Sequence, residues 1–226
     1  MSGREEILGR VREALSVPSH AGVKAVSGEG VRDVRKARGF LPDGGATPEA
    51  RLKKFRKLAA KLKAEVEVLP DLAAAGAFLA DLAKTEGWRQ IASHRNDLTN
   101  SVLTSLKVPI LWTDDEPGTA DLEQVEAGVT SCEALIAQTG SVFVTGKGCG
   151  GRALSVLPPH HVVIATLDQL LPDMLAAFDL LRERYGDNPP SFVSFITGAS
   201  RTGDIERILV LGAHGPKRLT ILIVGN

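Results

Sequence analysis

Cysteine is scarce in this sequence, with only Cys132 and Cys149 among 226 residues. Two thiols cannot build a disulfide framework, and alone they cannot supply the four thiolates of an iron–sulfur cluster. Free cysteine is most often a core residue, so we interpret both as buried, unreactive thiols. We therefore expect no cofactor held by this chain.

An excess of one charge sign and a long apolar run are also missing. The chain has 27 basic and 27 acidic residues, so it lacks the field that would concentrate nucleic acid at its surface. No apolar run approaches the roughly 20 residues of a membrane span. The first residues, MSGREEILGR, lack a secretory signal's apolar segment, which predicts a cytoplasmic location. Metal-ligand spacings such as HxxxH or CxxC are absent, which argues against a dedicated metal site.

What the chain does contain is an alternation of strand-like and helical patterns. Strands are expected at 66–70, 89–94 and 108–113, with helices at 71–87 and 98–106. Such alternation predicts right-handed crossovers and hence an α/β fold, an open and mostly parallel sheet flanked by helices. Ligands of these sheets bind beyond the carboxyl ends of the strands. The polar residues that follow one such end are His94, Asn96, Asp97 and Asn100.

The amino-terminal part differs in composition from the rest. Residues 4–15 have apolar side chains at helical spacing, and residues 16–46 are rich in Gly, Pro and Ser. We expect a helix and an arm over residues 1–46, followed by one α/β domain over 47–226. Thr47–Pro48 is typical of a helix start.

The carboxyl-terminal half predicts further elements of the same kind. Strands are expected at residues 160–166, 191–198 and 219–225. Thr166 and Gln169 form a potential capping box for a helix over residues 167–186. Pro172 either kinks that helix or marks its first turn.

The segment FITGASRTGDIERILVLGAHGPKR carries the most chemistry. A strand ends at Thr197, small residues follow, and a helix over 204–212 is expected to begin at Thr202 or Asp204. A strand, a small-residue turn and a helix start together expose N–H groups that attract a carboxylate or phosphate. The candidate anion-binding residues are Gly198, Ser200, Arg201, Thr202 and Asp204. Alternatively, Arg201 forms a salt bridge with Asp204 or Glu206.

Histidines supply candidates for proton transfer. His214 lies in the turn AHGPK, where an imidazole can act as acid or base, and it is our candidate catalytic residue. The alternative is a hydrogen-bonded turn histidine. A triad of Ser200, His214 and Asp204 lacks the GxSxG elbow of serine hydrolases. His160 and His161 precede a strand and should point to opposite faces, so we expect one of them, assigned as His160, to face the cleft as a binding residue.

A second potential anion-binding turn lies within residues 134–145. Two β-rich halves flank it, which predicts a hairpin. The turn residues are Thr139, Gly140 and Ser141, with Lys147 and Arg152 nearby in the glycine-rich GKGCGGR. An ordinary hairpin followed by a loop is the alternative interpretation.

Three segments in this order, QTGSVFV, LPPHHVVI and ITGASRTGDIERILVLGAHGPKRLTILIV, resemble the lactate utilisation protein C family, whose shared module is the LUD domain. The resemblance is strongest over residues 129–226. The last segment is similar to the family's TGPSRT loop, DIE helix start and GVHGP turn. Ala199 and Gly203 replace its usual proline and alanine. Gln138 stands where many relatives carry an acidic residue, which argues against an acid–base role there.

The resemblance implies a fold like that of sugar-phosphate isomerases and coenzyme A transferases. It also implies that the protein acts together with two iron–sulfur subunits in the oxidation of L-lactate to pyruvate. Our leading hypothesis is a component without an iron–sulfur cluster that binds a small carboxylate or phosphate-bearing ligand, or organises the iron–sulfur partners. The alternatives are a stand-alone enzyme on a phosphorylated, folate-like or coenzyme A-linked molecule, and a pure scaffold. Whether the isolated chain is catalytic stays open.

Overall fold

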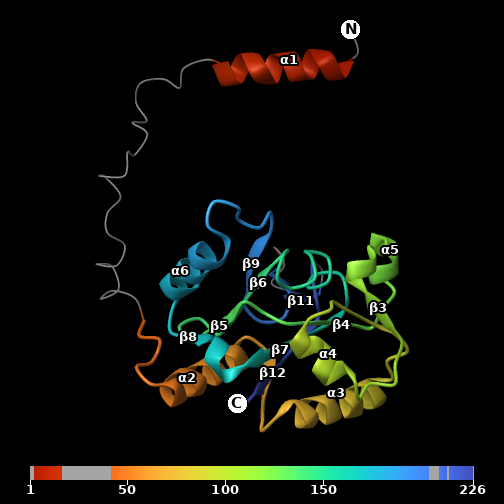
Figure 1. Ribbon diagram of the computed structural model, residues 1–226, viewed down its shortest axis with the longest axis vertical. Helices are drawn as coiled ribbons and strands as arrows, with labels where there is room; N and C mark the ends of the chain where they lie inside the picture. The colour runs from red at the N-terminus through yellow and green to blue at the C-terminus, as the bar shows by residue number, and fades with distance from the viewer. Residues whose placement is uncertain (1–2, 17–41, 204–208, 213, 226) are drawn as a thin grey trace. The chain divides into compact units, whose positions relative to one another are not determined.

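The computed structural model describes residues 3–16, 42–203, 209–212 and 214–225. The chain divides into two units, residues 1–41 and 42–226. In the first unit, helix α1 (Gly3–Ser16) confirms the helix expected over residues 4–15 (Figure 1). Most of the arm expected after it, residues 17–41, lies outside the described part of the chain.

The second unit contains a six-stranded parallel sheet with the strand order β1-β12-β7-β4-β2-β3. Its strands are β1 (Ala64–Leu69), β2 (Ile91–Ser93), β3 (Ile110–Trp112), β4 (Ala127–Thr130), β7 (His160–Thr166) and β12 (Arg218–Val224). Helix α2 (Pro48–Lys61) precedes β1, and the helices between the strands include α3 (Leu72–Glu86), α4 (Asp97–Leu103) and α5 (Thr119–Leu122). This arrangement confirms the predicted α/β class with a parallel sheet.

Alternate residues of the central strands pack on opposite layers. Val162 and Ile164 of β7 join a buried cluster with α3 and α4. Val163 and Ala165 face the other way, into a cluster that includes Phe55 of α2. Because both faces are covered by helices or further strands, the middle parts of β7 and β12 are almost entirely apolar.

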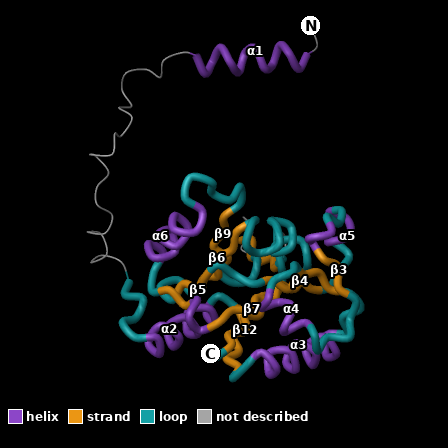
Figure 2. Tube along the Cα trace, in the orientation of Figure 1, coloured by secondary structure: helices purple, strands orange, loops and turns teal. Residues whose placement is uncertain are grey.

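A second, four-stranded sheet covers α2 (Figure 2). Its order is β8-β5-β6-β9, with β5 (Ala134–Ile136), β6 (Ser141–Thr145), β8 (Leu170–Leu171) and β9 (Val193–Ile196). Strands β5 and β6 pair antiparallel, which confirms the hairpin expected over residues 134–145. Leu135 and Val142 pack in the cluster with α2, while Ile136 and Phe143 pack beside Ala177 of α6 (Met174–Tyr185).

The predicted helix over residues 167–186 is wrong in its first part. The Thr166 and Gln169 pair encloses only a short 3₁₀ helix, Leu167–Gln169, after which the chain forms β8. A second 3₁₀ helix lies at Thr113–Asp115. Helix α6 begins at Met174, where Asp173 Oδ1 accepts a hydrogen bond from the Ala176 amide at 2.9 Å. Pro172 thus precedes the helix, since the residue before a proline disfavours helical backbone.

The helix expected over residues 204–212 is also wrong where the structure describes that segment. Arg201–Gly203 forms β10, which pairs antiparallel with β11 (Leu209–Leu211), and residues 204–208 lie outside the described residues. The amide of Ser200 donates to Pro216 O, and the amide of Gly212 donates to Ser200 O, both at 2.9 Å. These tertiary hydrogen bonds favour strands over the local helical pattern. The predicted combination of strand, turn and helix start is therefore not formed by the described residues.

Candidate functional site

A hollow of about 570 Å³ opens at the carboxyl ends of β2, β4 and β7. This volume is typical of small-molecule sites. Its lining residues are Asn96, Asp97, Leu98, Ser131, Cys132, Glu133, Gly148, Gln169, Arg184 and Tyr185. Two of the four polar residues expected at a strand end, Asn96 and Asp97, line it, whereas Asn100 does not.

Glu133 is the buried charge of this hollow, with 3% of its surface exposed. Its carboxylate accepts hydrogen bonds from the hydroxyls of Thr145 and Tyr185 and pairs with the Arg184 guanidinium. Three donors on one carboxylate offset the loss of its hydration. Burial, followed by the hydrogen bond to Glu133, raises the pKa of Tyr185.

A glycine permits this close arrangement. A Cβ added to Gly148 would lie 2.2 Å from Glu133 Oε1, which no side chain tolerates. The Gly148 amide also donates to Thr145 Oγ1 at 2.9 Å. The glycine-rich segment thus packs directly on the buried acid, which favours a packing role over a plain loop.

A second polar cluster lies beside Glu133. His94 Nε2 lies 3.2 Å from the Ser131 amide nitrogen and 3.1 Å from Ser131 Oγ. Asn96 Nδ2 donates to Ser131 Oγ at 2.8 Å. Burial lowers the pKa of His94, and the negative charge of Asp114 opposes that shift. The hollow therefore combines a buried acid and a half-exposed guanidinium, and the neutral imidazole of His94 lies behind Ser131 in its wall.

The comparison with known families agrees with this architecture. The sequence model of the LUD domain matches residues 52–224, which include every strand of the parallel sheet and the whole lining of the hollow. The chain belongs to the LUD domain family. This finding confirms the resemblance recognised in the sequence.

Curated relatives of this LUD domain are named Lactate utilization protein C. The protein of Bacillus velezensis is 32% identical over 124 residues, covering 53% of this chain and 52% of that protein. The protein of Deinococcus radiodurans is 32% identical over 114 residues, covering 49% and 53%. The chain thus spans about half the length of the curated relatives it matches. The crystal structure of a DUF162 family protein from Deinococcus radiodurans superposes with a TM-score of 0.60 at 19% identity, over 79% of this chain and 99% of that one. This likeness supports the fold.

The turn formed by Thr139, Gly140 and Ser141 packs on α2 of the LUD domain. Gly140 has a φ of 71°, and an added Cβ would lie 2.7 Å from the Ala59 amide nitrogen. Ser141 Oγ lies 2.8 Å from the hydroxyls of both Thr139 and Thr197. The turn's hydroxyls are therefore engaged with each other, and the lining of the hollow does not include them.

The residues predicted around Arg201 gather at the β10 and β11 hairpin. Gly198 packs on the end of α2, because an added Cβ would lie 2.3 Å from Leu62 O. Arg201 and His214 are exposed. Ser200 Oγ lies close to the turn at Gly215, where an added Cβ would be 3.4 Å away. Asp204 and the side chain of Thr202 lie outside the described residues, and the lining of the hollow contains none of this group.

His160 lies at the amino-terminal end of β7, the edge of the sheet opposite the hollow. Its Nε2 is 2.8 Å from Thr220 Oγ1, and the Trp88 ring meets it edge-on at 5.4 Å. Burial lowers the pKa of His160 to about 4. His161 Nε2 lies 2.9 Å from Thr130 Oγ1, and burial lowers its pKa to about 3. Both histidines are neutral packing residues, and His160 does not face the cleft as expected.

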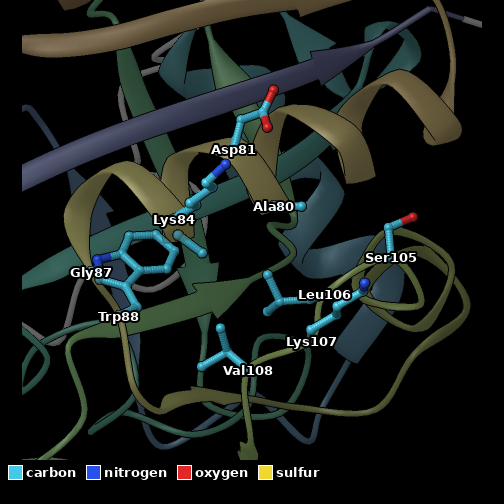
Figure 3. Close-up of a pocket in the computed structure, with 10 residues that line it drawn as sticks. Ala80, Asp81, Lys84, Gly87, Trp88, Ser105, Leu106, Lys107 and Val108 are labelled. Carbon is cyan, nitrogen blue, oxygen red and sulfur yellow. The ribbon is translucent and has the colours of Figure 1, made fainter.

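Another cavity, of about 490 Å³, lies between the end of α3 and the segment before β3 (Figure 3). Its walls include Trp88, Leu106 and Val108, and its charged residues Asp81, Lys84 and Lys107 are exposed. No buried ionisable side chain converges there. The hollow at the carboxyl ends, with its buried Glu133, is therefore the stronger candidate site.

Cys132 and Cys149 are free and buried, as the sequence predicts. Burial raises the pKa of Cys149 to about 12 and that of Cys132 well above its ordinary value, so both stay protonated near neutral pH. Within the described ranges, no group of three or more His, Cys, Asp or Glu side chains is placed to hold a metal ion. No helix there is long and apolar enough to cross a membrane.

Proposed function

We propose that this protein acts in lactate utilisation and binds a small monocarboxylate, such as L-lactate or pyruvate, in the hollow at the carboxyl ends of the strands. The names of its curated relatives support the pathway. One observation supports the ligand class: the Arg184 guanidinium, 45% exposed, is anchored on the buried Glu133 at the wall of the hollow.

Arg184 is suited to receive a carboxylate. Its Nη1 pairs with Glu133, and a guanidinium has five N–H donors, so the group can hold a second carboxylate while it is fixed by the first. Anchoring on Glu133 reduces the side-chain entropy that binding would otherwise cost. Ser131 and Tyr185 place hydroxyl oxygens in the same hollow, where each can accept a hydrogen bond from a ligand hydroxyl.

Two acids limit the charge of the ligand. Glu133 neutralises Arg184, and Asp97 adds a further negative charge to the lining. The lining carries a net negative charge, so a dianion would meet about twice the repulsion that a monoanion meets, and a monocarboxylate suits the hollow better than a dicarboxylate or a phosphate ester. Electron transfer from lactate belongs, in this proposal, to iron–sulfur partner subunits, which this chain would serve as a ligand-binding or organising component.

Calorimetric titration of the full chain with L-lactate and pyruvate, with and without partner subunits, tests the proposal. Arg184→Ala should weaken binding at least tenfold, since a charge-assisted bidentate contact is lost. The matched control is Arg182→Ala on the same helix, whose side chain is 73% exposed and pairs with Asp179. That variant should bind normally.

Arg201→Ala distinguishes this site from the hairpin turn that the sequence analysis favoured. Loss of binding in Arg201→Ala with normal binding in Arg184→Ala would move the ligand to that turn and overturn the proposed site. Absence of binding to either acid under both conditions would overturn the proposed ligand class.

A further inference from the structure

The Ser131 hydroxyl lies where the carboxyl ends of β2 and β4 meet. His94 follows β2, Asn96 precedes α4, and Ser131 follows β4. Ser131 Oγ lies 3.1 Å from His94 Nε2 and accepts a hydrogen bond from Asn96 Nδ2 at 2.8 Å. Residues distant in sequence thus converge on one hydroxyl that borders the hollow.

The hydrogen bonds determine which imidazole nitrogen carries the proton. The Ser131 backbone amide, 3.2 Å from His94 Nε2, can only donate, so Nε2 is the unprotonated nitrogen. The same lone pair faces the Ser131 hydroxyl. His94 is therefore in the tautomer that a general base for this hydroxyl requires, and burial keeps it neutral by lowering its pKa.

Asn96 supplies the third part of the arrangement. Its Oδ1 accepts the Thr99 amide at 2.7 Å, which fixes the side chain with its Nδ2 toward Ser131 Oγ. An N–H group aimed at this oxygen stabilises the negative charge that develops as the proton leaves. Gly150 closes the cluster from outside, because an added Cβ would lie 2.7 Å from His94 Cβ.

We propose that Ser131 is a nucleophile for acyl transfer, with His94 as its general base and small acyl esters as the substrate class. Ser131 Oγ bonds to the acyl carbon as its proton moves to His94 Nε2. The proton then passes to the departing alkoxide, which leaves as an alcohol. Water, deprotonated in turn by His94, hydrolyses the acyl-serine to a carboxylic acid and restores the hydroxyl. Arg184 lines the same hollow, and the N–H groups that its pairing with Glu133 leaves free can donate to the oxyanion.

This activity goes beyond a role in lactate utilisation and is tested without lactate or partner subunits. The full chain is incubated with p-nitrophenyl acetate and, separately, with an alkyl fluorophosphonate. Nitrophenolate release, intact mass and peptide mapping are the readouts. The expected results are one adduct per chain on Ser131, no adduct in Ser131→Ala, and at least tenfold slower labelling in His94→Gln.

The matched control is Ser155→Ala, a buried serine whose Oγ donates to the nearby Arg152 carbonyl at 3.4 Å. It should be labelled at the rate of the unchanged protein. Mapping the adduct on the unchanged chain decides the question even if Ser131→Ala fails to fold. An adduct on another residue, or no adduct after prolonged incubation, would overturn the proposal.

Discussion

Replacing Gly148 with alanine would place a methyl group against the buried carboxylate of Glu133. An added Cβ would lie 2.2 Å from Glu133 Oε1, whereas one at Gly146 would lie 3.4 Å from its nearest neighbour, the Phe192 Cβ. Gly148→Ala should therefore lower the free energy of unfolding by about 1–3 kcal/mol, as overpacking does, and Gly146→Ala should cost less. Urea unfolding of both variants measures this. Equal midpoints would show that Glu133 can move aside freely.

The buried histidines predict how stability depends on pH. An unfolded histidine has a pKa of about 6.5, while burial lowers the pKa of His160 to about 4 and of His161 to about 3. Between these limits the unfolded chain binds more protons than the folded one. The contribution of the two histidines to the free energy of unfolding therefore falls as the pH drops below about 6.5, and it levels off below their pKa values in the folded protein.

His161→Gln should make this dependence shallower between pH 6.5 and 4.5, by at most about 1.4 kcal/mol per pH unit. Glutamine can still bond the Thr130 hydroxyl, so the fold should tolerate the change. Urea midpoints at several pH values give the slope. A slope identical to that of the unchanged protein would contradict the assignment of His161 as a buried neutral group.

The sequence predicted only some of the residues that form the candidate site. The rule that ligands bind beyond the carboxyl ends of parallel strands located Asn96 and Asp97, because it needs only the order of strands and helices. It missed Glu133, Arg184 and Tyr185. The ionic partner of Glu133 lies 51 residues further along the chain, and the two meet only through the second sheet and α6. The available signal was a single acid in the otherwise apolar run SCEALIA.

Among the elements, α3 offers a test of capping. Asp71 Oδ1 accepts the Ala74 amide at 2.7 Å, which satisfies one of the donors that a helix start leaves free. Asp71→Ala should destabilise the protein by about 1 kcal/mol, and Asp71→Asn, which keeps the acceptor, by only a few tenths. Urea unfolding of the two variants side by side checks the difference. A similar loss in both would assign the effect to charge instead of to the hydrogen bond.

Elements whose caps and periodicity agree were predictable, and those decided by tertiary hydrogen bonds were not. Thr47 and Asp71 begin α2 and α3 as the sequence indicates. The segment DIERILVLG has helical spacing, yet Leu209–Leu211 pairs with Arg201–Gly203. The amide of Gly212 donates to Ser200 O, a partner that no local pattern reveals. The intrinsic preference of a short segment for helix or strand is a weak determinant of its structure where such strand pairing competes with it.

For the whole molecule, alternation of strands and helices predicted the parallel sheet, since crossover handedness leaves few other arrangements. It did not predict the second sheet. In that sheet β5 joins β8 in parallel and β6 pairs antiparallel with β9, so its strand order does not follow the chain. This sheet places Thr145 against Glu133, which lines the hollow, and this is why the site's acid was hidden from the sequence.

The residue at which the α/β domain begins can be tested by deletions from the amino-terminal end of the whole chain. Composition placed the start of the domain after residue 46, whereas the second unit begins at Pro42. Pro42 O accepts Gln138 Nε2 at 2.8 Å, Gly45 O accepts Arg51 Nε at 3.0 Å, and Gly44 is buried against Pro172. Residues 42–46 therefore contribute to the domain's packing.

Deleting residues 1–41 should leave the free energy of unfolding unchanged within about 0.5 kcal/mol, because the second unit has its own core. Deleting residues 1–46 should cost about 1–2 kcal/mol, since two hydrogen bonds and the packing of Gly44 are lost. Urea unfolding of the two deletion variants measures this difference. Equal slopes of the unfolding free energy against urea concentration would confirm that both variants expose the same surface on unfolding, so that a shift in midpoint reports a change in stability. If both deletions give the same midpoint, the bonds to Gln138 and Arg51 add nothing measurable, and the domain begins at the helix cap Thr47.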